Sequence, residues 1–346
     1  MSKPKASIIV PVYGVEQYLA GCLDPLMNQR TTIPYEVVIV DDGSKDNSGK
    51  IAESYHQKYS NIVKVIHTGN QGLPMARNVG IKYSRGEDIM FCDSDDIPSI
   101  DFVSILEETL HKKTDVECAN AGYMSMDFKS NVHNSFSKTN AYLLNLEVEF
   151  RNGSFLDIFA SDGLIVLRAY VWCKAFKREL LEKQGIQFYP YRTTFEDLPF
   201  VFSCYLSSKK VQCTKKIVYT YRTSRPGSIL NGGVKKDRLL THLSAIFACR
   251  SFAEKTLGKD KAVEMFANRK YRFYAQMIPD TEFYGEDKRL ALKQSRVLIN
   301  QLLKPVLPVK NTFLEKACKA YGGDDFDMVD GETLDQLSKL VKENKQ

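Results

Sequence analysis

In the segment Ile89-Met-Phe-Cys-Asp-Ser-Asp-Asp-Ile-Pro98, an apolar run passes directly into acidic residues. A short apolar run closed by turn residues is typical of a buried strand in a parallel sheet. Ligands of open α/β sheets bind at the carboxyl ends of such strands. Three carboxylates within four residues repel one another, and Mg²⁺ or Mn²⁺ would relieve that repulsion. The stretch therefore predicts either a cation-binding turn at a sheet edge or a solvated acidic turn that caps the next helix.

The residues before this stretch alternate between strand-like and helix-like patterns. Strands are predicted at 6–12, 36–40, 63–67 and 88–92, and helices at 15–28, 48–59 and 74–83. Pro25 lies inside the first helix and removes a backbone donor, so a kink or an early end is expected there. Alternating strands and helices with short connections predict a parallel sheet with helices on both faces, whose polar turns share one edge.

The composition is that of an ordinary globular protein, with 43% hydrophobic and 26% charged residues. A chain of 346 residues is too long for one ordinary hydrophobic core, so two or three structural units are expected. A net charge of +6 is modest for this length and does not imply a nucleic-acid partner. The eight cysteines include no C-x-x-C pair, which favours free thiols in a reducing compartment over disulfides or a zinc site.

The first residues lead directly into a predicted strand and leave no room for a signal peptide. No apolar run approaches the roughly 18 residues that a membrane-spanning helix needs. We therefore expect a soluble, cytoplasmic protein.

Common nucleotide-binding signatures are missing from the predicted sheet edge. The sequence contains neither G-x-G-x-x-G after the first strand nor G-x-x-x-x-G-K-[ST]. Two acidic turns, Asp41-Asp42 and Asp93 to Asp96, take their place, with Arg77 between them in sequence. A carboxylate can accept a hydrogen bond from a base, and an arginine can neutralise a diphosphate. The alternatives are a helix-capping turn at Asp41-Asp42 and a surface arginine at position 77.

Five segments carry a resemblance to a known family: Ile9–Tyr13, Val38–Ser44, Asn70–Gly80, Gly86–Asp88 and Phe91–Asp96. In this order and spacing they resemble the nucleotide-binding half of family-two glycosyltransferases with the GT-A fold. The resemblance covers about the first third of the chain, and it is specific because five separate motifs agree. It implies an α/β fold with a Rossmann-like, mostly parallel sheet flanked by helices, followed by a C-terminal helical region.

The resemblance also implies roles for residues in the first three segments. Pro11, Tyr13 and Asp42 would hold the nucleotide base. Asn70 and Arg77 would line the same nucleotide-sugar site.

The acidic turn has its own implied roles. Asp93 and Ser94 would contact the nucleotide sugar, while Asp95, together with Asp93 and Asp96, would hold Mn²⁺ or Mg²⁺. Two positions depart from the usual pattern of the family: Gly14 stands where the family often has Asn, and Pro74 stands where a small polar residue is common. Neither position carries the chemistry.

A second acidic pair, Glu196 and Asp197, opens a strongly apolar predicted helix of about a dozen residues. On pattern alone the pair caps the first helical turn, although a cavity there would place its pKa values under environmental control. Family-two enzymes often carry such a pair after a Lys-x-x-x-Arg-x-x-Leu segment, which Lys174–Leu181 resembles. The resemblance therefore implies that Asp197 is the catalytic base.

The chain is predicted to divide into three parts. Residues 1–122 form the nucleotide-sugar-binding half, 123–230 the acceptor-binding and catalytic half, and 231–346 a helical region. Within these parts, strands are predicted at 117–123 and 211–221, a short helix at 179–184, an exposed polar segment at 129–152, and helices at 236–257, 261–277, 288–303 and 313–321. Arg222 or Arg225, after the strand at 211–221, would reach the diphosphate or remain exposed.

Residues 235–320 are basic, with 18 Lys and Arg against 9 Asp and Glu. Basic helices with interleaved aromatic residues are able to rest on anionic lipid headgroups. The alternatives are a solvated helical bundle and a surface that joins copies in a homo-oligomer.

The resemblance implies an inverting, metal-dependent glycosyltransferase that moves a sugar from a UDP donor to a hydroxyl of a glycan or lipid-linked acceptor. Its place would be bacterial surface-polysaccharide synthesis at the inner face of the plasma membrane. A nucleotidyltransferase is one alternative, but it should show a Gly-rich phosphate loop, which Val12–Glu16 is not. The other alternative is a non-catalytic module that binds sugar nucleotides or glycans. Such a module should have lost some of the motif residues, whereas the motifs of this sequence are intact.

Overall fold

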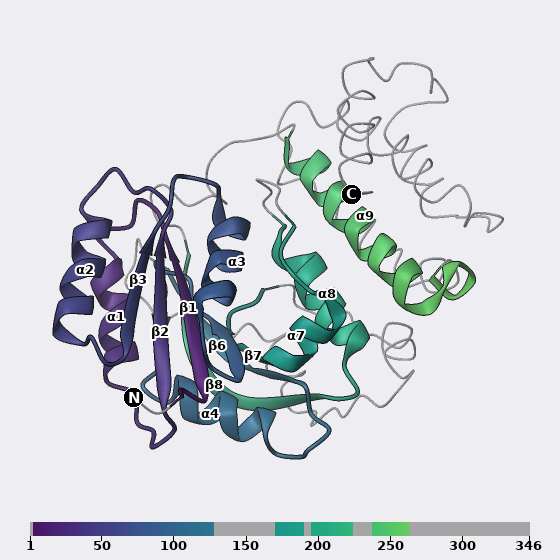
Figure 1. The fold of residues 1–346 in the computed structure, drawn as a ribbon, viewed down its shortest axis with the longest axis horizontal. Coiled ribbons are helices and arrows are strands. Elements are labelled where there is room, and N and C mark those ends of the chain that lie inside the picture. Colours follow the sequence, from purple (N-terminus) through teal and green to yellow (C-terminus); the bar gives the residue numbers. More distant parts are fainter. Residues whose placement is uncertain (1–2, 128–169, 190–194, 224–236, 263–346) are drawn as a thin grey trace. The chain divides into compact units, whose positions relative to one another are not determined.

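The computed structural model describes residues 3–127, 170–189, 195–223 and 237–262 (Figure 1). The strands are β1 (Ala6–Val12), β2 (Tyr35–Asp41), β3 (Val63–His67), β4 (Asp88–Phe91), β5 (Ile97–Pro98), β6 (Cys118–Asp127), β7 (Lys174–Lys177) and β8 (Val211–Thr223). The helices are α1 (Leu19–Met27), α2 (Ser48–Lys58), α3 (Leu73–Tyr83), α4 (Phe102–Leu110), α7 (Arg178–Gln184), α8 (Asp197–Ser207) and α9 (Asp237–Leu257). The polar segment 129–152 and the predicted helices at 288–303 and 313–321 lie outside the described residues, as does nearly all of 261–277.

The strands form one sheet in the order β3-β2-β1-β4-β7-β6-β8-β5. Strands β3, β2, β1 and β4 run parallel to one another, as the alternating pattern predicts. The sheet then changes direction, because β7 pairs antiparallel with both β4 and β6. β8 runs parallel to β6, and the short β5 pairs antiparallel with β8. The fold is thus α/β with a mixed sheet, in which β3, β2, β1 and β4 of the N-terminal half are all parallel.

The order of the parallel strands decides where the acidic turns lie. β2 and β4 are the two neighbours of β1, and all three strands end at the same edge of the sheet. Asp42 follows β2 and donates its N–H to the carbonyl of Val12, while Cys92 follows β4 and donates to the carbonyl of Ile9. The turns after the second and fourth strands therefore flank the end of the first strand.

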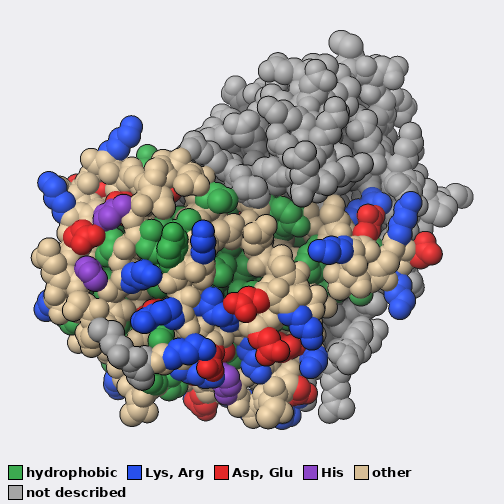
Figure 2. Space-filling view, in the orientation of Figure 1, with side chains coloured by type: hydrophobic (Ala, Val, Ile, Leu, Met, Phe, Trp, Pro, Cys, Tyr) green, Lys and Arg blue, Asp and Glu red, His purple; other side chains and the backbone are tan. Residues whose placement is uncertain are grey.

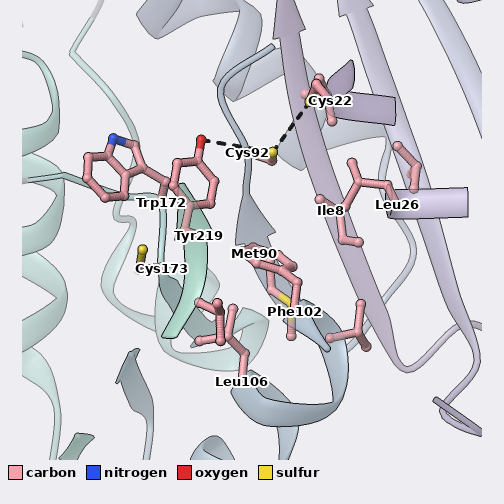
Figure 3. Close-up of a cluster of buried hydrophobic side chains, with 14 of the residues drawn as sticks. Ile8, Cys22, Leu26, Met90, Cys92, Phe102, Leu106, Trp172, Cys173 and Tyr219 are labelled. Carbon is pink, nitrogen blue, oxygen red and sulfur yellow. Dashed lines mark hydrogen bonds between the residues drawn. The ribbon is translucent and has the colours of Figure 1, made fainter. Parts of the chain in front are cut away.

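The two faces of the sheet bury alternate residues of each strand. Ile8, Met90 and the other side chains of one face pack against Leu26 of α1 and against Phe102 and Leu106 of α4 (Figure 3). The opposite face carries Phe91, whose ring meets those of three further buried residues edge-on: Phe176, Phe188 and Phe200. The apolar core thus fixes α1 and α4 on one face and the start of α8 on the other.

Helix α1 departs from its predicted start. Residues 15–18 form a turn in which Tyr18 donates its N–H to the carbonyl of Val15, so the helix begins at Leu19 instead of Val15. It includes Pro25 and ends at Met27, two residues later. β6 is longer than predicted and extends to Asp127, because it pairs along β8 over most of its length.

The chain divides into two compact units. The first comprises residues 1–155, 165–192 and 196–231 and holds the sheet, and the second comprises residues 156–164, 193–195 and 232–346 and holds α9. On the face shown in Figure 2, basic and acidic side chains are intermingled over the described residues. The predicted boundary between residues 122 and 123 lies inside the first unit and stays a prediction.

A glycine on α3 allows that helix to approach the sheet closely. A Cβ on Gly80 would lie 2.3 Å from Cγ2 of Ile9 in β1. We expect Gly80→Ala to lower the free energy of unfolding, because overpacking costs about 1–3 kcal/mol and the better helix propensity of Ala returns only about 1 kcal/mol. Urea unfolding measures the change. Gly69→Ala is the control, since a Cβ there would meet nothing within 4 Å; equal midpoints for the two variants would contradict the close packing.

Candidate active site

Arg77 on α3 joins the acidic turn to the acidic start of α8. One guanidinium nitrogen donates to Oδ1 of Asp93 at 2.8 Å. The other terminal nitrogen donates to Oε1 of Glu196 at 3.0 Å and to Oδ1 of Asp197 at 2.5 Å. The guanidinium also lies 5.3 Å from the ring centre of Phe188. With 1% of its side chain exposed, Arg77 is a buried cation shared by three carboxylates.

The charges in this group do not balance. Three carboxylates surround one guanidinium, so full ionisation would leave two negative charges in a largely buried place. Burial raises the pKa of Asp197 to about 8; the charge of Arg77 lowers it, and the charges of Glu196 and Asp93 raise it further. Burial also raises the pKa of Glu196. The group therefore holds a proton near neutral pH, and Asp197 is where the pKa is raised most clearly.

Strand β8 holds the acidic turn from the other side. The N–H of Asp93 donates to the hydroxyl of Tyr219 at 2.9 Å, and the ring of Tyr219 stacks on Trp172 at 4.9 Å. Figure 3 shows this Tyr219 hydroxyl directed toward Cys92, next to the turn. Further along β8, the backbone N–H of Arg222 donates to Oδ1 of Asp96. The backbone of the turn is thus fixed by a strand more than 120 residues away.

The oxygen atoms of this turn fit a divalent cation. Asp96 is fully buried, and its pKa is raised by burial and by the charges of Asp95 and Asp93. Within the described part of the chain its Oδ2 has no hydrogen-bond partner. Asp93 and Asp95 are half-buried in the same turn. Hard cations such as Mg²⁺ and Mn²⁺ take carboxylate oxygens as ligands, so this donor set suits them.

Arg222 lies close to this turn. Its guanidinium donates to the carbonyl of Asp95 at 3.0 Å and lies 5.6 Å from the ring centre of Tyr18. Of the two alternatives for Arg222, the one in which it remains exposed does not hold, because β8 carries it against the acidic turn. Arg225 lies outside the described residues.

Asp42 organises the loop between β3 and α3. Its Oδ1 accepts hydrogen bonds from Oγ1 of Thr68 at 3.1 Å and from the N–H of Gln71 at 2.9 Å, and its Oδ2 accepts from the N–H of Gly72 at 2.7 Å. Asn70 lies exposed in this loop. Neither carboxylate of the pair caps the next helix: Asp41 accepts from the N–H of Ser44, which lies ahead of α2, and the N-cap residue of α2 is Asn47.

The remaining predicted residues lie at the same sheet edge. Pro11 is buried in β1 opposite Val40, and Tyr13, just beyond the end of β1, is 48% exposed. Ser94 is buried in the acidic turn. The structure thus gathers the predicted residues at the ends of β1, β2 and β4, and it brings Arg77, Asp93 and Asp197 into direct contact.

The sequence reasoning did not identify several residues that shape this site. The sequence pattern marks Glu196 only as half of an acidic pair, and Tyr219 only as part of a predicted strand. His67 donates or accepts at both ring nitrogens, with Asp41 at 2.9 Å and Glu53 at 2.8 Å, and these two contacts raise its pKa. Spacing along the chain gives no signal for such contacts, because each joins separate elements.

The family is established by comparison with known proteins. Residues 7–185 match the model of Glycosyl transferase family 2, which is more than half of the chain. The chain therefore belongs to glycosyltransferase family 2.

Two relatives are bacterial proteins. EpsJ of Bacillus subtilis (strain 168), described as an uncharacterized glycosyltransferase, is 34% identical over 227 residues, 65% of this chain and 63% of EpsJ. The poly(ribitol-phosphate) beta-glucosyltransferase of Bacillus spizizenii is 30% identical over 276 residues, 78% of this chain and 40% of that protein. The chain thus spans less than two thirds of the length of either relative.

A solved structure shares the fold. TarS 1–349 of S. aureus, in complex with UDP-GlcNAc, superposes with a TM-score of 0.59 at 19% identity, covering 94% of this chain and 95% of that one. The predicted GT-A fold is confirmed. In the part of the chain that the structure describes, no helix is long and apolar enough to span a bilayer.

The charge imbalance around Arg77 predicts a pH dependence. The folded-state pKa of Asp197 is about 8, above the roughly 3.9 of an Asp in an unfolded chain. Between these two pH values the folded chain binds more protons than the unfolded chain. The free energy of unfolding therefore falls as the pH rises through this window. Asp197→Asn removes this titration. We expect the variant to unfold at higher urea concentration than the wild type at pH 8, with the difference shrinking toward pH 5.

Asp101→Asn is the matched control, because Arg30 lowers the pKa of the half-buried Asp101. That variant should lose a little stability at pH 8 and none at acidic pH, the opposite sign. If Asp197→Asn is less stable than the wild type at pH 8, the excess negative charge around Arg77 does not destabilise the folded state, and the prediction is wrong.

Proposed function

We propose that this chain is an inverting glycosyltransferase that moves a sugar from a nucleoside diphosphate donor to a hydroxyl of a glycan or lipid-linked acceptor. The observation that carries the proposal is the shared guanidinium of Arg77. It holds Asp93 of the acidic turn and Asp197 of α8 on adjacent nitrogens. A carboxylate suited to proton removal therefore lies beside the turn suited to a sugar diphosphate.

The donor is proposed to lie along the ends of β1, β2 and β4. Tyr13 and the loop that Asp42 orders would contact the base, with Pro11 and Asn70 beside them, and Asp93 and Ser94 would contact the rest of the nucleotide sugar. The exposed face of Tyr13 supports base stacking. UDP is the proposed nucleotide, supported by the UDP-GlcNAc complex of TarS, which shares the fold.

A divalent cation is part of the proposal. Mn²⁺ or Mg²⁺ held by Asp95, with Asp93 or Asp96, would stabilise the negative charge of the departing diphosphate. The guanidinium of Arg222, held against the backbone of the same turn, adds a positive charge near the leaving group.

Asp197 is proposed as the general base. It would take the proton of the acceptor hydroxyl as that oxygen attacks the anomeric carbon from the side opposite the diphosphate. One such displacement inverts the anomeric centre and needs no second nucleophile. A base works best when its pKa lies near the working pH, and the raised pKa of Asp197 meets that condition. Arg77 is a positioning residue, since it orients this carboxylate.

The setting of the reaction is proposed from the relatives. The acceptor would bind to residues 123–230, and the product would be a bacterial surface polysaccharide made at the cytoplasmic face of the membrane. The poly(ribitol-phosphate) beta-glucosyltransferase, 30% identical over 276 residues, supports a polymeric acceptor.

A thermal-shift series tests the donor site. UDP, GDP, CDP and ADP are each added to the full chain with and without Mn²⁺. We expect UDP with Mn²⁺ to raise the unfolding midpoint more than any other combination, because the acidic turn binds the diphosphate through a cation. A chain that ignores every nucleotide would contradict the proposed function, and a response to UDP without added metal would contradict the metal dependence alone.

Asp197→Asn tests the base. The variant should keep the UDP response but lose sugar transfer by about 10²–10⁴-fold, the usual worth of a general base. Release of UDP from a panel of UDP-sugars, with water or a glycan as acceptor, measures the rate. Asp101→Asn on the surface should retain the wild-type rate. Transfer by Asp197→Asn within a few fold of wild type would exclude Asp197 as the base.

A further inference from the structure

A second cluster of ionisable groups lies at the opposite end of β4. Asp88 is the first residue of that strand, whereas the acidic turn follows its last residue. Glu107 lies on the last turns of α4, and His111 caps the carboxyl end of this helix. The cluster therefore joins α4 to the end of β4 that is remote from the proposed active site.

The three side chains present their polar atoms to one another. Nε2 of His111 lies 2.7 Å from Oδ2 of Asp88 and 3.5 Å from Oε2 of Glu107. One atom from each of the three lies within 4.8 Å of the other two. The two carboxylates are 2% and 4% exposed and the imidazole 37%, so the cluster is buried on the protein side and open to solvent at His111.

One oxygen of the cluster has no partner. Within the described residues, Oε1 of Glu107 is buried and accepts no hydrogen bond. Burial, followed by the charge of Asp88 and a hydrogen bond with Asp88, raises the pKa of Glu107 to about 8. Buried polar atoms without partners are uncommon in proteins, and a bound ion is one of the usual reasons for them.

A lysine lies nearby but has its own partner. Nζ of Lys5 is 3.5 Å from Oδ2 of Asp88, yet it is only 2.8 Å from Oε2 of Glu87. Its hydrogen bond is to Glu87. Lys5 therefore compensates only part of the negative charge of Asp88 and Glu107, because its closer partner is Glu87.

We propose that Asp88, Glu107 and His111 form a Zn²⁺ site that fastens α4 to β4. Two carboxylates and one imidazole are ligands that Zn²⁺ accepts, and water at the open side would complete a tetrahedron. Bonds of about 2.0–2.2 Å place tetrahedral ligand atoms roughly 3.3–3.6 Å apart. The separations of 2.7 Å and 3.5 Å from Nε2 of His111 to the two carboxylates lie near this spacing. The site is separate from the proposed Mn²⁺ or Mg²⁺ turn, where every ligand is an oxygen.

The experiment uses the full chain after treatment with a chelator. Zn²⁺ is titrated calorimetrically, and Co²⁺ is added as a spectroscopic probe because imidazole coordination changes its visible absorption. We expect one Zn²⁺ to bind per chain and to raise the unfolding midpoint. His111→Ala should lower the affinity for Zn²⁺ at least tenfold and remove the shift; this side chain is partly exposed, so the variant is expected to fold.

Three further variants separate the alternatives. His67→Ala is the matched control, because His67 also contacts two carboxylates but on opposite ring nitrogens, and it should bind Zn²⁺ as the wild type does. Glu107→Gln should weaken binding without a large change of shape. Asp95→Asn should keep Zn²⁺ binding. Absence of Zn²⁺ binding to the wild type, or loss of it in Asp95→Asn but not in His111→Ala, would overturn the proposal.

Discussion

Arg77 brings a permanent positive charge into the interior, where burial of an unpaired charge is prohibitively costly. Its side chain is 1% exposed, so its three carboxylate partners are a condition of the fold at this point. These partners come from the turn after β4 and from the start of α8, while Arg77 itself comes from α3. A buried guanidinium thus sets the distance between Asp93 and Asp197, which no single element could do. Removing all three carboxylates would leave an uncompensated buried charge and would be strongly destabilising, whereas neutralising one of them still leaves two partners for the guanidinium.

The sheet places the rest of the site around that interaction. β1 lies between β2 and β4, so the strand order runs to β2 and β3 on one side of β1 and to β4 on the other. Ligands of open α/β sheets bind where strand connections diverge in this way. Asp42 uses its carboxylate to order the backbone of residues 71 and 72, whose N–H groups would otherwise be unpaired. The site therefore combines a rigid edge with one loop that a side chain organises.

Much of this arrangement follows from local sequence. The strand Val63–His67 has the predicted bounds, and the strands before the two acidic turns end within one residue of the predicted position. These ends are predictable because a short apolar run that stops at acidic residues marks where a buried strand ends. The start of α1 was missed, since residues 15–18 carry helical spacing but form a turn. The reversal at β7 was also missed, because strand direction depends on partners far along the chain.

The contacts of the candidate site were harder to predict than its residues. Arg77 and Glu196 are 119 residues apart, and Asp93 and Tyr219 are 126 apart. Motif spacing marked Arg77, Asp93 and Asp197 as separate participants in binding and catalysis. It contained no information that the first of them pairs with the other two. The cluster of Asp88, Glu107 and His111 was invisible for the same reason, since only packing of α4 on the sheet brings it together.

The proposed chemistry depends on the same imbalance that the fold has to tolerate. Three carboxylates around one guanidinium keep a proton on the group, and burial places the pKa of Asp197 at about 8. An ordinary exposed Asp, with a pKa near 3.9, would be ionised at neutral pH but too weak a base to draw a proton from a sugar hydroxyl. Burial makes Asp197 a stronger base, while Arg77 prevents the pKa from rising so far that the carboxylate is never ionised. The stability lost in this group is therefore the physical origin of its basicity.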